Sequence, residues 1–154
     1  MIRSSKSKTN VNRARCITIR EYEEVKLCSP YGDKPIYILK RWWLRNTRTN
    51  AQRIDAAICM QPLTIERNKV FLIGEICKHP EFADYSIVRT PLITDTEGKY
   101  VLTTAGTVYY LHGWCDYKYQ RWLKRNKIIY DYNDPQPIKI IDTHTPSIIE
   151  ASID

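Results

Sequence analysis

Short apolar runs separated by turn residues dominate the chain between residues 69 and 111. The stretches 69–77, 85–93, 100–104 and 107–111 are rich in β-branched and aromatic residues, and the segments between them contain Pro, Gly or Asp. This pattern is typical of strands, and Ala105-Gly106 supplies the two-residue connection of a tight hairpin. We therefore predict a four-stranded antiparallel meander over about 69–111, with Pro91 marking an edge or a bulge.

The preceding part of the chain predicts a hairpin over about 36–60. Residues 36–45 have high β propensity, 46–53 are polar without an acid, and 54–60 have the apolar character of a return strand. Upstream of the hairpin, residues 15–20 alternate in the manner of a strand, whereas 21–28 fit either one short helix or a continuing strand. A loop with Pro at both ends follows at 29–35.

One short helix is predicted at about 116–127, after the meander. Asp116 can cap its first turn, and Tyr119, Trp122 and Leu123 share one face at helical spacing. The apolar residues of 128–132 are compatible with one further strand.

Together these elements predict an α+β fold that is mainly antiparallel β. Partial closure into a small SH3-like or OB-like barrel would remove the exposed edges of the sheet. The 154 residues fit one domain. We divide the chain into a flexible basic arm (1–14), a single β-rich domain (15–132) and an acidic, Pro-rich tail that is extended or disordered (133–154).

The charge distribution suggests a polyanionic partner. The chain carries 24 Lys and Arg against 17 Asp and Glu, a formal net charge of +7. The end of the chain is acidic by contrast, because residues 131–154 hold five acids and one base. A basic body can bind a polyanion, and an acidic tail can compete for the same surface. The alternative is that the charge only maintains solubility.

The apolar runs, the N-terminal segment and the cysteines indicate where the protein is expected to act. No apolar run approaches the roughly 18 residues that span a bilayer, and the first fifteen residues contain no apolar core of a secretory signal. The five cysteines are odd in number and include no CxxC pair, so together with the missing signal they predict reduced thiols in a cytoplasmic protein. Because no apolar run is long enough to span a bilayer, we expect no membrane partner.

Two clusters combine cations with aromatic rings, as nucleic-acid binding requires: cations for phosphates and flat faces for unstacked bases. We predict the nucleic-acid-binding residues to be Lys40, Arg41, Trp43, Arg45, Arg48 and Arg53 in the first cluster, and Lys118, Arg121, Lys124, Arg125 and Lys127 in the second. Because neighbouring strand residues point to opposite faces, we expect Trp42 or Trp43 to belong to the core. The competing interpretation treats both clusters as a solvated rim around core tryptophans.

The sequence signals for a catalytic or a metal site are weaker than the signal for nucleic-acid binding. Cys77, His79, His112 and Cys115 have zinc-ligand chemistry, but they end the first and the fourth strand of the meander, at opposite edges of the sheet. His79 with Glu81 and Asp84 could form a general base or a Mg²⁺ site, although a turn closed by Asp84 explains the same residues. The chain has no P-loop, GxGxxG or HExxH motif. We predict no catalytic residue, no metal and no small-molecule cofactor.

The stretch from Ile73 to Leu111 has a distinctive order of residues. It contains Gly74-Glu75-Ile76, His79-Pro80-Glu81-Phe82-Ala83-Asp84, Thr90 and Ile93, Thr104-Ala105-Gly106-Thr107, and Tyr109 with Leu111. This order resembles a signature of small uncharacterised bacterial and phage-encoded proteins, and it covers about a quarter of the chain. It departs from the signature at Asp84-Tyr85, where the family has Asp-Gly, and at Thr90-Pro91, where the family has Thr-Ser. The resemblance implies a β-hairpin unit and a bacterial or mobile-element setting, with no activity attached.

The sequence thus predicts a non-enzymatic protein that binds DNA or RNA with low sequence specificity. The alternative is a protein–protein interaction module, such as a small subunit or inhibitor of a larger complex, because Tyr, Trp and Arg also concentrate binding energy at protein interfaces. A metal-dependent nuclease using His79 and Asp84 is the third hypothesis.

Overall fold

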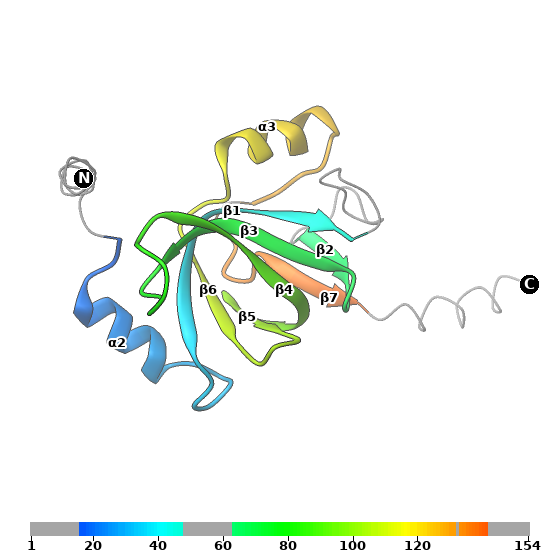
Figure 1. The fold of residues 1–154 in the computed structure, drawn as a ribbon. Helices are drawn as coiled ribbons and strands as arrows, with labels where there is room; N and C mark the ends of the chain where they lie inside the picture. The colour runs from blue at the N-terminus through cyan, green and yellow to red at the C-terminus, as the bar shows by residue number, and fades with distance from the viewer. Residues whose placement is uncertain (1–15, 48–62, 132, 142–154) are drawn as a thin grey trace, which may run out of the picture.

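A computed structural model describes residues 16–47, 63–131 and 133–141 and shows a ring of strands flanked by two helices (Figure 1). The elements follow in the order α2 (Ile19–Leu27), β1 (Ile36–Asn46), β2 (Leu63–Glu66), β3 (Val70–Cys77), β4 (Ser86–Glu97), β5 (Tyr100–Thr103), β6 (Val108–His112), α3 (Tyr117–Arg125) and β7 (Ile138–Ile141). Neither of the helices in these ranges has the length and apolar character needed to cross a membrane.

The predicted meander is confirmed. β3, β4, β5 and β6 pair in succession, each antiparallel to the next. The bulge expected at Pro91 is also present: Phe71 pairs with Leu92 and Ile73 with Arg89, so β4 has one residue more than β3 at this point. The Thr90 hydroxyl accepts a hydrogen bond from the Leu72 N–H at 2.9 Å, which keeps that buried amide satisfied within the bulge.

The ring of strands closes through β1. β1 is antiparallel to β3 and parallel to β6, which completes the order β1-β3-β4-β5-β6. Closure is uneven, because β1 pairs with β3 over more positions than with β6. β1 is the first strand of the predicted hairpin; the tip beyond Thr47 and the return strand at 54–60 lie outside the described residues.

The strand expected at 15–20 is wrong over its described residues 16–20, because helix α2 begins at Ile19. The Thr18 hydroxyl accepts from the Glu21 N–H, and the Glu21 carboxylate accepts from the Thr18 N–H, each at 3.0 Å. This capping box satisfies two amide groups that a helix start would otherwise leave unpaired. The capping box outweighs an alternation that extends over only six residues. The described residues therefore form two short helices instead of the one expected.

The strand expected at 128–132 is also wrong over its described residues 128–131, which form no strand. Ile128 is buried, and the ring of Tyr130 meets Trp42 edge-on at 6.4 Å. The apolar character of this segment therefore reflects packing against the core beneath α3. Further along, Ile138–Ile141 form β7, which pairs in parallel with β2.

Two apolar clusters stabilise this arrangement. The larger one fills the ring and continues beneath α3, and includes Leu39, Trp42, Leu72, Tyr119 and Leu123, none of them more than 1% exposed. The smaller one lies under α2 and includes Cys16, Ile17, Val25, Ile38 and Cys77. Figure 1 shows the corresponding positions of the helices, with α3 across one side of the ring and α2 at one end.

Candidate functional site

A β-bulge in β1 shapes the candidate site. Lys40 pairs with Glu75 and Trp43 with Ile73, so β1 contains an extra residue at this point. Arg41 has a φ of 49°, a left-handed conformation that is rare for a residue other than glycine. Bulges re-aim side chains and occur next to functional sites.

Gly74 permits this bulge. A Cβ atom on Gly74 would lie 2.9 Å from the Leu39 Cγ, 3.0 Å from the Lys40 carbonyl oxygen and 3.1 Å from the Trp42 Cα. Two of these three atoms belong to the backbone of β1, which has little freedom to move. β1 can therefore approach β3 this closely only because residue 74 has no side chain.

Next to the bulge lies an open hollow of about 730 Å³, which we call the bulge cleft. It is formed by β1, β3, Tyr85, the end of β6 and the start of α3. Its lining residues are Lys40, Arg41, Glu75, Tyr85, His112, Gly113, Trp114, Cys115, Asp116, Tyr117 and Gln120. Trp114 and Tyr117 are 57% and 67% exposed, so their rings are accessible to a ligand in the cleft.

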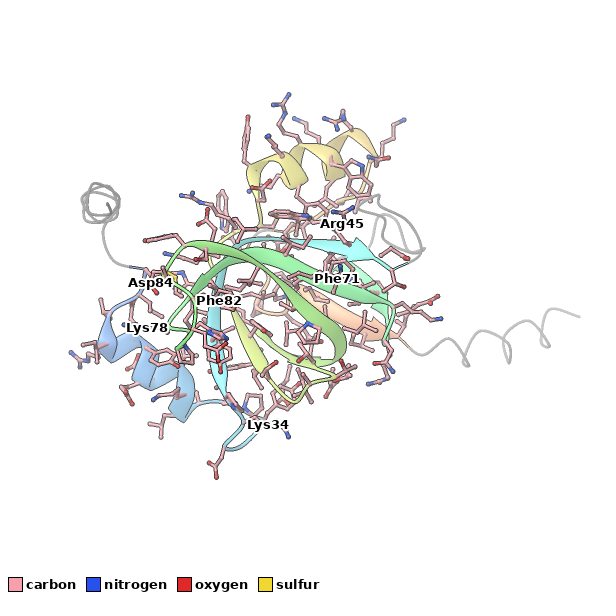
Figure 2. All side chains as sticks on the ribbon, in the orientation of Figure 1. Lys34, Arg45, Phe71, Lys78, Phe82 and Asp84 are labelled. Atoms are coloured by element: carbon pink, nitrogen blue, oxygen red, sulfur yellow. A yellow bond between two sulfur atoms is a disulfide. The ribbon has the colours of Figure 1, made fainter. Side chains whose placement is uncertain are left out.

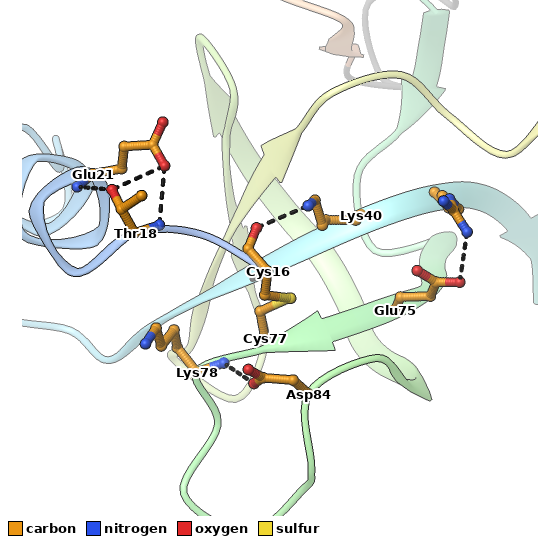
Figure 3. The surroundings of a disulfide bond; sticks show 9 residues. Cys16, Thr18, Glu21, Lys40, Glu75, Cys77, Lys78 and Asp84 are labelled. Atoms are coloured by element: carbon orange, nitrogen blue, oxygen red, sulfur yellow. Dashed lines mark hydrogen bonds and ion pairs between the residues drawn. A yellow bond between two sulfur atoms is a disulfide. The ribbon is translucent and has the colours of Figure 1, made fainter. Parts of the chain in front are cut away.

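The two cations of the bulge cleft are engaged with groups of the protein (Figure 3). The Lys40 ammonium donates to the Cys16 carbonyl at 2.8 Å and lies 5.9 Å from the centre of the Tyr85 ring. The Arg41 guanidinium lies 3.5 Å from the Glu75 carboxylate. Glu75 and Asp116 also line the cleft, so its cations and carboxylates are equal in number.

A disulfide between Cys16 and Cys77 holds the chain at the Lys40 end of the cleft (Figure 3). The two Cα atoms are 6.0 Å apart although the residues are separated by 61 positions. The expectation of reduced cysteines is therefore wrong for this pair, because folding brings two buried sulfurs together that the sequence keeps far apart. Cys28 and Cys115 are free, and burial raises the pKa of the Cys115 thiol to about 12.

His112 lies between the bulge cleft and the smaller apolar cluster. Burial lowers the pKa of its imidazole, and the charge of Lys40 lowers it further. Its Nδ1 is buried and has no hydrogen-bond partner among the described residues. Both effects favour the neutral form of the imidazole.

Asp116 connects the two predicted basic clusters. Its N–H donates to the Trp42 carbonyl at 2.8 Å, and its carboxylate caps α3 by accepting from the N–H groups of Lys118 and Tyr119. The cap predicted at this residue is confirmed. One residue thus fixes the start of the basic helix α3 against the bulge of β1.

Behind α3 lies a second hollow of about 540 Å³, which we call the helix cleft. It is lined by Tyr117, Gln120, Arg121, Lys124, Lys127, Ile128, Ile129 and Tyr130, among which there are three cations and no acid. The Arg121 guanidinium lies 5.7 Å from the centre of the Tyr117 ring. Tyr117 and Gln120 line both clefts, so the two hollows adjoin each other.

The predicted site residues of β1 are only partly available to a ligand. Arg41 is exposed, whereas Lys40 and Arg45 are partly buried (Figure 2 labels Arg45). Trp42 is 1% exposed and Trp43 packs against the larger core cluster, in agreement with the expectation that one of them is core. Arg48 and Arg53 lie outside the described residues.

The predicted residues of the second cluster are all exposed. They are Lys118, Arg121, Lys124, Arg125 and Lys127. Side chains with nitrogen at their ends project from α3 away from the ring in Figure 2. Sequence reasoning missed Trp114, Tyr117 and Gln120, which line the clefts. The signal was the proximity of Trp114 and Tyr117 to the second cluster, but the segment before the helix gave no reason to expect a hollow.

The loop between β3 and β4 uses its polar groups internally. The Asp84 carboxylate accepts from the Lys78 N–H at 3.0 Å, and the His79 Nδ1 accepts from the Glu81 N–H at 3.0 Å. The His79 ring lies between Tyr37 and Phe82, with ring centres 4.3 and 4.8 Å away. These contacts support the interpretation of His79 and Asp84 as residues that close the turn, and Phe82 beside them is 46% exposed.

The four residues considered as zinc ligands do not converge within the described ranges. There, the only group of three metal-ligating side chains with close ligand atoms is Cys16, Cys77 and Asp84, and the two sulfurs of that group form the disulfide.

Comparisons with protein-family models, with curated proteins and with solved structures find no match to this chain. The resemblance of the Ile73–Leu111 segment to small bacterial and phage-encoded proteins therefore stays a prediction.

Proposed function

We propose that this protein binds nucleic acid, DNA or RNA, with low sequence specificity and without catalysing a reaction. The observation that carries the proposal is the exposure of every cation on α3 and in the turn after it. The segment 117–127 contains five Lys and Arg residues and no acid, and all five are exposed. A group of exposed cations close together attracts phosphates and releases their counterions.

The shape of the surface supports the same proposal. The helix cleft is lined by three cations and the Tyr117 ring, and it adjoins the bulge cleft, which contains Trp114. Cations for the backbone next to exposed rings for bases are the combination that nucleic-acid-binding proteins use without sequence specificity. Lys124 and Arg125 lie in the last turn of α3, where their positive charges interact favourably with the negative end of the helix dipole.

The test is a fluorescence-anisotropy titration of nuclease-treated protein with labelled single-stranded DNA, duplex DNA and RNA. Five phosphate contacts predict that affinity falls by about 100-fold or more between about 50 and 200 mM salt. Absence of binding to all three ligands at the lower salt would reject the proposal.

A protein–protein interaction module is the second candidate, and a separate hollow favours it. This hollow of about 280 Å³ lies away from α3 and is lined by Ile76, His79, Phe82, Ile87, Val88, Arg89 and Tyr109. Ile87 and Phe82 are 60% and 46% exposed, which is unusual for large apolar side chains in one patch. A stoichiometric protein complex that survives nuclease treatment and high salt would favour this candidate over nucleic-acid binding.

A further inference from the structure

The two adjoining clefts differ in charge, and the difference suits them to different parts of a ligand. Among its lining residues the helix cleft has three cations and no acid, whereas the bulge cleft has two cations and two carboxylates. The bulge-cleft cations are engaged as well: Lys40 with the Cys16 carbonyl and Arg41 with Glu75. Phosphates are therefore attracted to the helix cleft much more strongly than to the bulge cleft.

The bulge cleft has the chemistry that an unpaired base requires. A base has a flat apolar face and a polar edge, and the cleft presents the exposed rings of Trp114 and Tyr117 next to polar side chains. The imidazole of His112, the amide of Gln120 and the carboxylate of Glu75 supply these polar groups. Tyr117 lines both clefts, so a strand can place a base in one hollow while its backbone follows the other.

We infer that the ligand is a single strand, with its bases in the bulge cleft against Trp114 and Tyr117 and its phosphates along the helix cleft. This inference rests on the proposed nucleic-acid binding and specifies its ligand. In a duplex the bases stack on one another and present only their edges to the grooves. The rings in the bulge cleft have nothing to stack on in a duplex, so a single strand gains contacts that a duplex does not.

The first experiment compares three ligands of equal length: a single strand, the corresponding duplex, and a single strand of abasic sugar-phosphate units. DNA and RNA versions of the single strand are both used. We expect the single strand to bind at least about 10-fold more tightly than the abasic strand, since one stacked base contributes on this scale. We expect it also to bind at least about 10-fold more tightly than the duplex at equal salt.

The second experiment tests the ring of Trp114. Trp114→Ala should weaken single-strand binding by about 10-fold and leave the salt dependence unchanged, because it removes a stacking surface and no phosphate contact. Trp114→Phe keeps a ring and should retain most of the affinity. Phe82→Ala is the matched control, since Phe82 is an exposed aromatic residue outside both clefts.

Intrinsic fluorescence provides an independent measurement. Trp42 is buried and Trp43 and Trp122 are partly buried, so Trp114 is the most exposed of the four tryptophans. A base stacked on Trp114 should quench the emission, and Trp114→Phe should remove that quenching while the strand still binds.

Three results would overturn the inference while the proposed function survives: duplex binding as tight as single-strand binding, equal binding of the abasic strand, or unchanged affinity in Trp114→Ala. Failure of every ligand to bind would instead reject the proposed function itself.

Discussion

β1 and α3 both carry closely spaced cations beside tryptophans, yet the two elements present them to solvent in different ways. β1 lies within the ring, where it pairs with β3 and, over Ile36–Lys40, with β6. Its Trp42 and Leu44 are buried in the larger core cluster, and its Lys40 contacts the Cys16 carbonyl. α3 touches the ring with one face, through Tyr119 and Leu123, and leaves its cations in solvent. Similar composition therefore produces a shaped, charge-balanced hollow on β1 and a uniformly basic face on α3.

The largest effect is expected from loss of the disulfide that holds the β1 side of this comparison. Cys16→Ser should lower the free energy of unfolding by about 4 kcal/mol, because a closed loop of this length restricts the unfolded chain. Denaturant unfolding measures the change, and wild-type protein with a dithiol reductant should approach the variant. Cys28→Ser, at an exposed free cysteine, is the control. Equal stability of Cys16→Ser and wild type would show that the bond contributes nothing.

Charge reversal on α3 tests the role of its exposed cations, the second region of this comparison. Arg121→Glu with Lys124→Glu should weaken single-strand binding by about 100-fold and reduce the salt dependence by about two phosphate contacts. Arg41→Gln should cost less than about fivefold, because Glu75 already balances that cation.

The matched control for this pair is Arg20→Glu with Lys34→Glu, which changes net charge equally at exposed positions away from α3 (Lys34 is labelled in Figure 2). Equal loss of affinity in both double variants would mean that net charge, and not the α3 surface, determines binding.

Gly74→Ala tests whether the bulge creates the hollow next to β1. The new Cβ would press on two backbone atoms of β1, so we expect a loss of about 1–3 kcal/mol in unfolding free energy. Binding of the abasic strand, which uses the helix cleft, should be unchanged, whereas the preference for strands with bases should fall. Gly106→Ala is a control in open space, although the φ of +81° adds strain to that turn. Unchanged stability in Gly74→Ala would contradict the close approach of β1 and β3.

The smallest expected effect is a pH dependence from His112. Burial, together with the charges of Lys40 and Lys99, lowers its pKa below the ordinary value of 6.5, and Glu21 opposes this only partly. The unfolded chain therefore takes up a proton at a higher pH than the folded protein does. The contribution of neutral His112 to the free energy of unfolding is fully present above the ordinary pKa of histidine. It declines as the pH falls from that value toward the lower pKa of the folded protein. Thermal unfolding across this range should show a decline that is smaller in His112→Gln; identical profiles would contradict the role of burial.

Local patterns predicted the elements whose signals lie close together in the chain. The meander strands end at turns marked by Pro, Gly or Asp, and α3 begins directly after its cap Asp116. Both follow because turn and capping preferences act over a few residues. The same physics explains the error at 15–20, because the Thr18–Glu21 capping box is also a local signal and it prevails over the short alternation. The candidate residues of α3 could be predicted for the same reason. A short helix packs one face, with Tyr119 and Leu123, against the core and leaves the charged residues of its other face in solvent.

The sequence by itself therefore determined the meander, the basic helix and the cations that surround it. Tertiary structure alone decided the parallel pairings of β1 with β6 and of β2 with β7, the Cys16–Cys77 bond and the bulge over Gly74. Each of these joins residues that are far apart in the chain, and its stability depends on how the whole ring packs. The site belongs to this second group, because Trp114 and Tyr117 meet Lys40 and Arg41 in one cleft only after the ring has closed.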